Sequence, residues 1–320
     1  MADKLLSLIW GYRLSQAIHV VAVLGVPDLV AEVARTPSEL AALTGSDTVM
    51  LHRVLRALAA HGVMDEDDAG RFGMTELGER LRSDVPGSVR AVAIALFRPS
   101  VWDAWGRFAD SVRSGESAFR LTHGVDLWEY GAAHPEERRV FDDAMVAQTR
   151  GAAQAILDAY DFADAETIVD VGGGRGALLE AILATYPSTE GVLFDQPQVV
   201  DGVDLGPRAR IIGGSFFDAV PAGGDLYLLK WILHDFEDDP ATRILRTIRN
   251  ACDGHARLLV IERDLGAPET TLSDLHMLVA LGGRERTETE YANLLRSGGF
   301  ALSRAIQTSG PLTLFEALPA

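Results

Sequence analysis

Chemically reactive side chains follow several short apolar runs of this chain. Asp170, Asp195 and Glu262 each stand at or just after the end of such a run, and Lys230 and His234 follow another. If these runs are parallel strands, their carboxyl ends meet at one edge of a sheet, where ligands of such folds bind. We therefore expect one site along that edge, formed by Asp170, Asp195, Ser215, Phe216, Lys230, His234 and Glu262.

The glycine-rich turn after Asp170 indicates a nucleotide-type ligand. A β-branched run precedes the turn and an apolar helical run follows it, so backbone and a helix N-terminus approach the ligand closely. Gly172, Gly174 and Ala177 fit the dinucleotide spacing G-x-G-x-x-A, with Asp195 near the place of a ribose-binding acid. Asp170 favours another ligand, because a carboxylate before the glycines repels a pyrophosphate but suits an ammonium or sulfonium group.

Length and charge limit the class of protein. The chain has 320 residues, which predicts about two domains. Its net charge of −17 disfavours nucleic acids and anionic membranes as partners. Its one cysteine, Cys252, forms no internal disulfide and stands in no metal-binding spacing. No apolar run reaches the ~18 residues of a membrane span and the start lacks a signal-peptide pattern, so we expect a cytoplasmic protein.

Strands and helices alternate after the glycine turn. This alternation predicts a doubly wound, mostly parallel Rossmann-like sheet, closed by an antiparallel hairpin at residues 300–306 and 311–318. A capping box at Thr287–Glu290 opens a late helix. The five expected parallel strands are Thr167–Val169, Gly191–Asp195, Arg210–Ile212, Asp225–Lys230 and Arg257–Ile261.

The first half of the chain predicts a mainly helical, winged-helix-like domain over residues 1–150, followed by a catalytic domain over 151–320. Residues 5–33 are apolar nearly all round, which is typical of a helix buried against a second subunit or within its own chain. A capping box at Thr36–Glu39, a second helix and a short hairpin follow. This pattern also suggests DNA binding, but four acidic residues at 65–68 occupy the wing tip, where phosphates would lie.

Aromatic helices precede the glycine turn and suggest a pocket for a flat substrate. Trp102 is one candidate contact, although core packing is the commoner use of such rings. Arg150 lies close in sequence to the turn and could reach a ligand carboxylate. We also expect Asp235, His276 and Met277 to face the substrate.

Taken together, six motifs resemble one family over nearly the whole chain. They are DVGGGRG, FDQP, GGSFFD, LLKWILHDFEDD, LLVIER and GGRERTETEY. In this order they are similar to the S-adenosylmethionine-dependent O-methyltransferases of the plant caffeate and bacterial anthracycline type. The run that ends in His234-Asp235 is the most specific of the six, and the glycine turn the least.

The resemblance assigns roles to individual residues. It implies that Gly172 cradles the methionine part of S-adenosylmethionine and that Asp195 holds its ribose. Ser215 and Phe216 match positions that flank the adenine, although plant members usually carry an acid where Ser215 stands. Lys230 matches a further cofactor contact. It implies three catalytic residues, with a general base and two flanking acids: His234, Glu262 and Glu285.

The implied chemistry agrees with these residue types. Methyl transfer from sulfonium to oxygen is an in-line displacement that needs no metal, so the protein must align two ligands and remove a hydroxyl proton. Alternatives are the same fold with hydroxylation, decarboxylation or a pericyclic reaction, or a winged-helix regulator. His234 and its acids argue against the first group, whose members tend to lose the base. A nicotinamide oxidoreductase is disfavoured, since no tyrosine–lysine set for hydride transfer is evident. We expect a homodimer that acts on an aromatic or polyketide small molecule in natural-product biosynthesis.

Overall fold

The computed structural model describes residues 2–320, which divide into two compact units. The first unit contains the residues up to Trp102 together with Glu136–Gly151. The second contains Asp103–Pro135 and Ala152–Ala320. The sequence suggested one boundary at residue 150, whereas in the structure the chain passes between the units three times, and the aromatic segment 103–135 groups with the sheet.

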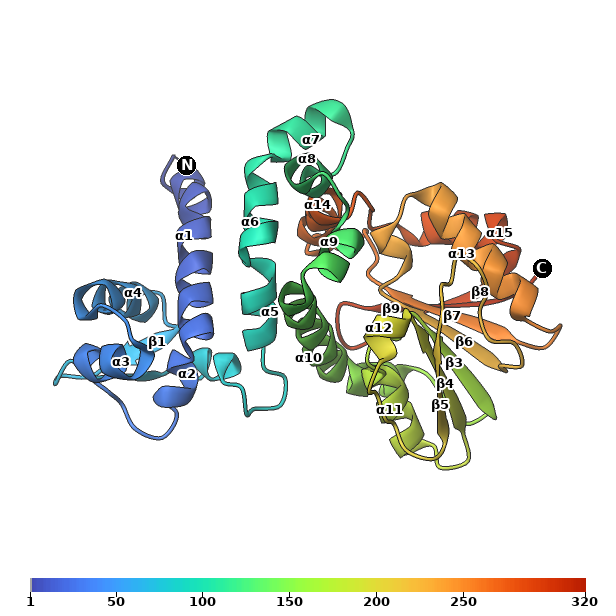
Figure 1. Cartoon of the computed structure of the whole chain (residues 1–320), viewed down its shortest axis with the longest axis horizontal. Helices are drawn as coiled ribbons and strands as arrows, with labels where there is room; N and C mark the ends of the chain where they lie inside the picture. The colour runs from blue at the N-terminus through green and yellow to red at the C-terminus, as the bar shows by residue number, and fades with distance from the viewer. Residues whose placement is uncertain (1) are drawn as a thin grey trace. The chain divides into compact units, whose positions relative to one another are not determined.

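The second unit is built on the predicted doubly wound sheet (Figure 1). Seven strands lie in the order β5-β4-β3-β6-β7-β9-β8. The parallel strands are β3 (Thr167–Val171), β4 (Glu190–Asp195), β5 (Ala209–Gly213), β6 (Leu226–Lys230) and β7 (Arg257–Glu262). The hairpin strands are β8 (Phe300–Gln307) and β9 (Thr313–Pro319), and β9 runs antiparallel to β7. The order reverses between β3 and β6, which is where ligands of this fold bind.

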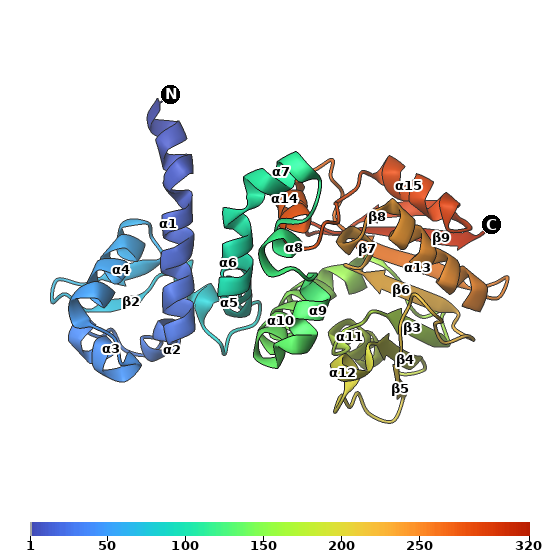
Figure 2. The same ribbon diagram turned by 45° about the horizontal axis from the view of Figure 1, so that its top comes forward.

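Helices cover both faces of the sheet, and Figures 1 and 2 show them on opposite sides. Ile168 packs on the side of α11 (Ala177–Thr185) and of the end of α10 (Pro135–Ala159). The next residue, Val169, packs on the side of α13 (Asp238–Ala251) and α15 (Glu288–Ser297). Burial on both faces is the reason that these strands are continuous apolar runs.

The remaining elements of the second unit surround this sheet. The short helix α12 (Pro197–Val200) follows β4, the 3₁₀ turn η2 (Leu233–Asp235) follows β6 and α14 (Thr270–Ala280) follows β7. The aromatic segment forms α7 (Phe108–Ser114), α8 (Ala118–His123) and α9 (Leu127–Ala133). Helix α13 begins at Asp238, and its N-cap Glu237 makes no capping bond with its side chain.

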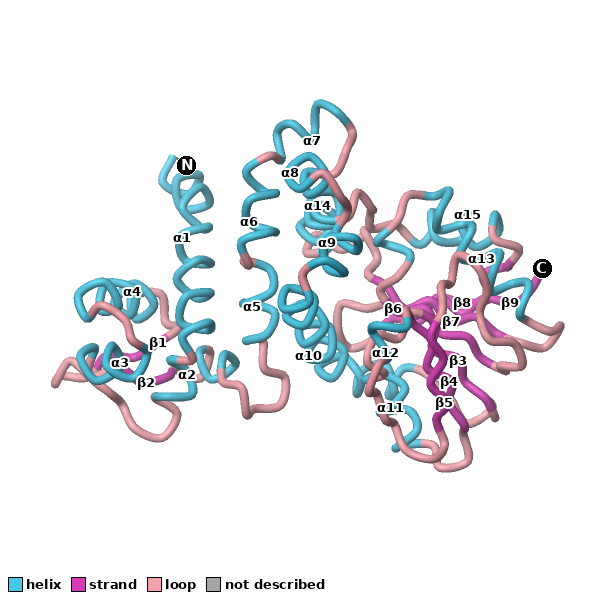
Figure 3. Tube along the Cα trace, viewed as in Figure 1, coloured by secondary structure: helices cyan, strands magenta, loops and turns pink. Residues whose placement is uncertain are grey.

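The first unit is the expected set of helices with a two-stranded hairpin, which Figure 3 distinguishes by colour. Its core joins residues of successive elements, among them Val21, Leu40, Leu55 and Phe72. Its elements are α1 (Ala2–Leu24), α2 (Val26–Leu29), α3 (Pro37–Thr44), α4 (Thr48–Ala60), β1 (Met64–Glu66), β2 (Phe72–Met74), η1 (Gly78–Leu81) and α5 (Arg90–Leu96). The helix α6 (Pro99–Gly106) begins in this unit and ends in the other. No helix among residues 2–320 has the length and apolarity to cross a membrane.

The long apolar segment at the start of the chain is two helices. Gly25 separates them with a φ of 70°, a left-handed conformation that glycine adopts without strain. The end of α1 contributes Val21 and Ala22 to the core of its own unit. Its beginning leaves Leu8 and Ile9 exposed by 69% and 55%. Packing within the same chain therefore explains the apolar residues at the end of α1. Burial against a second subunit would explain those at its beginning.

Candidate active site

The glycine turn after β3 is held against the end of β4. The amide of Gly174 donates to the Asp195 carboxylate at 2.8 Å, and that of Gly172 donates to the Phe194 carbonyl at 2.7 Å. Gly172 has a φ of 69°, and a Cβ atom there would lie 2.5 Å from Ile232. Glycine is thus required at this position for its backbone conformation and for space. One carboxylate oxygen of Asp195 thus links the glycine turn after β3 to the end of β4, and both belong to the expected cofactor site.

Asp170 and Lys230 lie at the switch point, at the ends of the adjacent strands β3 and β6. Burial raises the pKa of Asp170 to about 7, against the opposing effect of the Lys230 charge. Burial likewise lowers the pKa of Lys230 to about 7, which Asp170 and Glu262 oppose. One oxygen of Asp170, Oδ2, has no hydrogen-bond partner among the described residues. An unpaired buried carboxylate oxygen of this kind suits a ligand that carries an ammonium group.

Aromatic rings gather beside the glycine turn. Phe216, which follows β5, packs against Phe217 and Phe236 at centroid distances of 4.9 and 6.0 Å. Its Cε1 atom would lie 3.5 Å from a Cβ atom on Gly172, so this ring borders the turn. Phe236 is a member of this group that the sequence did not single out. The Ser215 hydroxyl accepts a bond from the amide of Phe217 at 3.2 Å.

A strained turn follows β6 and carries His234. Trp231 has a φ of 56°, and no other non-glycine residue among the described ones has a positive φ. Such a conformation costs on the order of 1–3 kcal/mol and persists only where neighbouring contacts hold it. Glu262 Oε1 accepts the amides of Ile232 and Leu233 at 3.0 and 2.9 Å. The carboxylate at the end of β7 therefore fixes the turn that positions the histidine.

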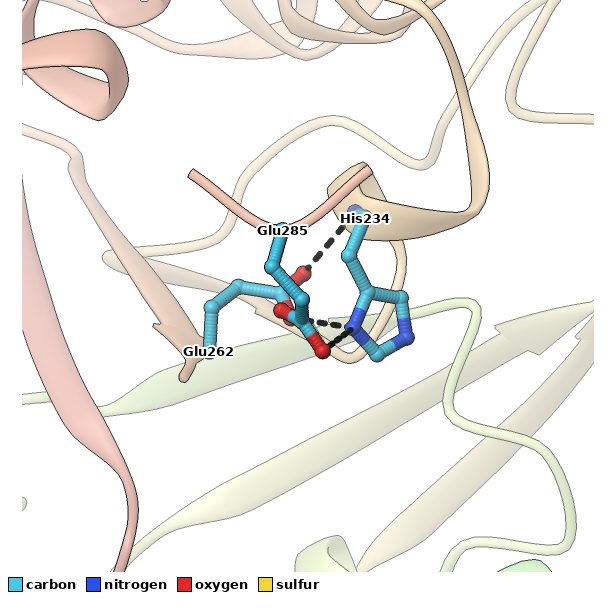
Figure 4. A group of neighbouring side chains, drawn as sticks. All are labelled: His234, Glu262 and Glu285. Carbon is cyan, nitrogen blue, oxygen red and sulfur yellow. Dashed lines mark hydrogen bonds and ion pairs between the residues drawn. The ribbon is translucent and has the colours of Figure 1, made fainter. Parts of the chain in front are cut away.

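The imidazole of His234 lies between three carboxyl groups. Its Nδ1 atom is 3.1 Å from Glu262 Oε2 and 3.4 Å from Glu285 Oε1, and Figure 4 shows both glutamates on the same side of the ring. Its Nε2 atom is 3.3 Å from Asp235 Oδ1. The structure thus brings together all three expected catalytic residues, and it places Asp235, expected at the acceptor, beside the ring.

These carboxylates set the charge of the ring. Burial alone would lower the pKa of His234, but the charge of Glu262 and hydrogen bonds with Asp235 and Glu285 outweigh it and raise the pKa well above 6.5. Burial raises the pKa of Glu262 to about 7, which the positive charge of His234 opposes. Burial alone would raise the pKa of Glu285, but its bonds with His234 and Ser273 outweigh this effect and lower the pKa overall. A proton on Nδ1, facing two carboxylates, leaves Nε2 as the nitrogen able to accept another.

Helix α14 makes hydrogen bonds with Glu285 of this cluster. The Ser273 hydroxyl donates to Glu285 Oε1 at 2.7 Å, and Asp274 accepts the backbone amide of Glu285 at 2.9 Å. On the same helix, the ring of His276 stacks on that of Trp105, with centroids 6.3 Å apart, and Met277 is buried. Ser273 was not expected from the sequence.

Two of the expected ligand contacts lie in the first unit. Trp102 packs against Tyr12 and Phe97 at centroid distances of 6.4 and 6.0 Å. Arg150 lies on α10. Their ligand contacts remain predictions.

Comparison with known proteins identifies the family. The O-methyltransferase domain model matches residues 105–301, and the O-methyltransferase dimerisation domain model matches residues 6–84. The chain belongs to the O-methyltransferase family. It is an S-adenosylmethionine-dependent O-methyltransferase, as the sequence motifs indicated.

Relatives of this methyltransferase match along its whole length. Phenazine O-methyltransferase PhzM of Lysobacter antibioticus is 42% identical, with 100% of this chain and 96% of the relative covered. O-demethylpuromycin-O-methyltransferase of Streptomyces alboniger is also 42% identical, with 99% and 89% covered. The structure of human N-acetylserotonin methyltransferase in complex with S-adenosylmethionine is similar with a TM-score of 0.93 and 29% identity, covering 100% of this chain and 98% of that one.

The residues at the edge of the sheet fit the cofactor of this family, S-adenosylmethionine. Asp170 Oδ2 is a buried acceptor without a hydrogen-bond partner among the described residues, as an amino group requires. A Cβ atom on Gly172 would lie 2.5 Å from Ile232 Cδ1, so the turn presents bare backbone at this position. Bound S-adenosylmethionine supplies the methyl group and the sulfonium leaving group.

Proposed function

We propose that this methyltransferase acts on a hydroxyl group of an aromatic or polyketide small molecule in natural-product biosynthesis, with His234 as the general base. The observation that carries the proposal is the pair of glutamates on Nδ1. Because Glu262 and Glu285 favour a proton on Nδ1, the lone pair of neutral His234 stands on Nε2, where a hydroxyl can donate its proton. The two 42% identical relatives are both named for O-methylation, one of a phenazine and one of O-demethylpuromycin.

The carboxylates also strengthen the base. A phenol resembles tyrosine, with a pKa near ~10, while an ordinary histidine has a pKa near ~6.5. Each unit by which the pKa of His234 is raised makes the proton transfer about 1.4 kcal/mol less unfavourable. Asp235, beside Nε2, and the two glutamates stabilise the imidazolium that forms. Such assistance contributes about 10²–10⁴-fold in rate.

The cofactor side of the proposal uses the edge of the sheet. Gly172 and Gly174 border the methionine part, Asp170 accepts from its amino group and Asp195 accepts from the ribose. Ser215 and Phe216 flank the adenine, and Lys230 and Arg150 complete the set. Within the second unit, the acceptor lies against His276 and Met277. Two chains associate through the exposed apolar half of α1.

A labelling experiment with a His234 variant tests the function. Purified protein is incubated with methyl-labelled S-adenosylmethionine and a panel of phenols, polyketide hydroxyls and aryl amines. We expect label on the oxygen of at least one aromatic or polyketide hydroxyl. His234→Gln should transfer the methyl group about 10²–10⁴ times more slowly while it melts like the parent protein, because glutamine is similar in size and still polar.

Two outcomes contradict this proposal. Label found only on nitrogen or carbon would reject the hydroxyl acceptor. A His234→Gln variant that transfers methyl at the parental rate in a single turnover would reject His234 as the base. His61→Ala is the matched control, since His61 is exposed at the end of α4 and should leave the rate unchanged.

A further inference from the structure

We propose that His234, Glu262 and Glu285 form a binding site for Zn²⁺, and that zinc bound there inhibits the enzyme. The binding step stands on the geometry of the three side chains alone. The inhibition rests on the proposed role of His234 as the base. Zinc is an inhibitor in this proposal, and methyl transfer itself proceeds without it.

The donor atoms have the separation that a tetrahedral zinc ion requires. Zinc binds nitrogen at ~2.0–2.1 Å and carboxylate oxygen at ~2.0–2.2 Å, so neighbouring donors of a tetrahedron lie about 3.3 Å apart. His234 Nδ1 is 3.1 Å from Glu262 Oε2 and 3.4 Å from Glu285 Oε1. One donor atom from each of the three residues lies within 4.8 Å of the others. The two nitrogen–oxygen separations therefore already match a tetrahedral site, and the two glutamate oxygens need only approach each other from within 4.8 Å.

Two of these three donor atoms lack hydrogen-bond partners. His234 Nδ1 and Glu262 Oε2 have none among residues 2–320, although Nδ1 lies within ion-pair distance of both acids. The third, Glu285 Oε1, accepts a bond from Ser273 at 2.7 Å, while the Oε2 atom of the same carboxylate has no partner among these residues. The side chains of both glutamates are 0% exposed and that of His234 is 7% exposed. Unpaired buried polar atoms are costly, and here they face one another (Figure 4). A shared cation satisfies them together.

The charge of the surroundings favours a divalent cation. Asp235 Oδ1 lies 3.3 Å from the other nitrogen of the ring, so three carboxylates surround the imidazole. The nearest opposing cation recorded for them is Arg263, whose guanidinium is 4.0 Å from Glu285 Oε1. With a neutral ring and a charged Lys230, which interacts with Glu262, three carboxylates and two cations leave a net charge of −1.

The ligand types select the ion. Zinc accepts both imidazole nitrogen and carboxylate oxygen as ligands, and a site with three protein ligands leaves a fourth position for water. Calcium takes 6–8 oxygen ligands at 2.3–2.6 Å, about a third of an ångström longer than zinc, and magnesium prefers oxygen in a near-octahedral shell. Neither suits three donors that include a ring nitrogen.

Zinc on Nδ1 removes the base. The ion forms a bond to the Nδ1 lone pair, and the single proton of the neutral ring then resides on Nε2. That nitrogen has no lone pair left for a hydroxyl proton. Methyl transfer should therefore stop while the protein remains folded and still binds S-adenosylmethionine.

Calorimetry with ZnCl₂ on the full chain tests binding without an acceptor or any turnover. We expect one zinc ion per chain, and a Kd at least about tenfold higher for Glu285→Gln, which keeps the size of the side chain but loses its charge. His61→Ala controls for binding at surface histidines and should bind like the parent. In the assay, zinc should stop methyl transfer and a chelator should restore it.

A crystal of the parent protein soaked in ZnCl₂ provides a test that needs no variant. Anomalous scattering at the zinc edge should give a peak about 2 Å from His234 Nδ1. No calorimetric binding, unchanged affinity of a folded Glu285→Gln variant, or an anomalous peak only elsewhere would each overturn the site. Binding with undiminished methyl transfer would overturn the inhibition. A parent protein that binds zinc there but methylates no hydroxyl would reject the proposed function and leave the site standing.

Discussion

With His234 as the proposed base, the charge state of its imidazole should set the pH range in which this enzyme works. His234 accepts a proton only when it is neutral, and its neutral fraction grows as the pH rises through its pKa. Since the neighbouring carboxylates raise that pKa well above 6.5, the neutral form becomes abundant only at a higher pH than for an ordinary histidine. The stronger base is thus less available at neutral pH.

We predict a pH profile that follows from the raised pKa of His234. With an acceptor whose own pKa lies above the range scanned, kcat/KM should rise from pH 6 and level off only in the alkaline range. Glu285→Gln removes a carboxylate that raises the pKa of His234, so its rising limb should move to lower pH. Glu288→Gln, an exposed change on α15, should leave the limb in place. A limb for Glu285→Gln at the parental position or higher would contradict the assignment.

A second prediction at this scale concerns Asp195. Its Oδ2 atom accepts from the amide of Gly174 at 2.8 Å, and its proposed role is to bind the ribose. Asp195→Ala should weaken S-adenosylmethionine binding by about 1.5–3 kcal/mol, the range for hydrogen bonds to charged groups. Calorimetry on this variant and on the exposed control Asp201→Ala measures the difference. Equal affinities would place the ribose elsewhere.

At the scale of elements, a buried arginine holds the turn between β6 and α13, and we call its set of bonds the clamp. Arg286 is 0% exposed, and its guanidinium donates to the carbonyls of Leu233 and Phe236 at 2.8 Å each. It also pairs with Asp238 at 2.8 Å. These bonds hold both ends of the segment that carries His234. Glu262 binds the amides of the same segment, so a cation and an anion fix opposite backbone groups of one turn.

We predict that this clamp stabilises the whole fold. Arg286→Met should lower the free energy of unfolding by about 1–3 kcal/mol, because it removes the buried donor that binds the Leu233 and Phe236 carbonyls. Arg286→Lys should recover part of it, since lysine keeps the charge but not the forked geometry. Urea unfolding gives the values, and Arg296→Met, an exposed arginine on α15, is the control. A loss for Arg286→Met no larger than that of the control would show that the clamp contributes nothing.

At the scale of the whole molecule, the beginning of α1 presents a continuous apolar surface. Leu5, Leu6, Leu8, Ile9 and Trp10 are all exposed in the single chain. A surface of this kind rarely stays in water on a stable protein and marks an interaction site. The dimerisation domain model begins at residue 6, within this surface.

We predict that charges on this surface separate the subunits. Light scattering at micromolar concentration should give the mass of a dimer for the parent protein and of a monomer for the double variant Leu8→Glu, Ile9→Glu. Leu318→Glu, which changes an exposed leucine on the terminal hairpin, should remain a dimer. A monomeric parent protein would remove the proposal.

The amino-acid sequence by itself determined the sheet and the edge that carries the site. Burial on both faces requires uninterrupted apolar strands, and the capping boxes at Thr36 and Thr287 formed as their spacing predicted, since both depend on neighbours within three or four residues. His234, Glu262 and Glu285 came from the family motifs. Only the tertiary structure decided how they meet. The strain at Trp231 and the burial of Arg286 follow no local period, because they depend on groups far apart in the chain that packing brings into contact.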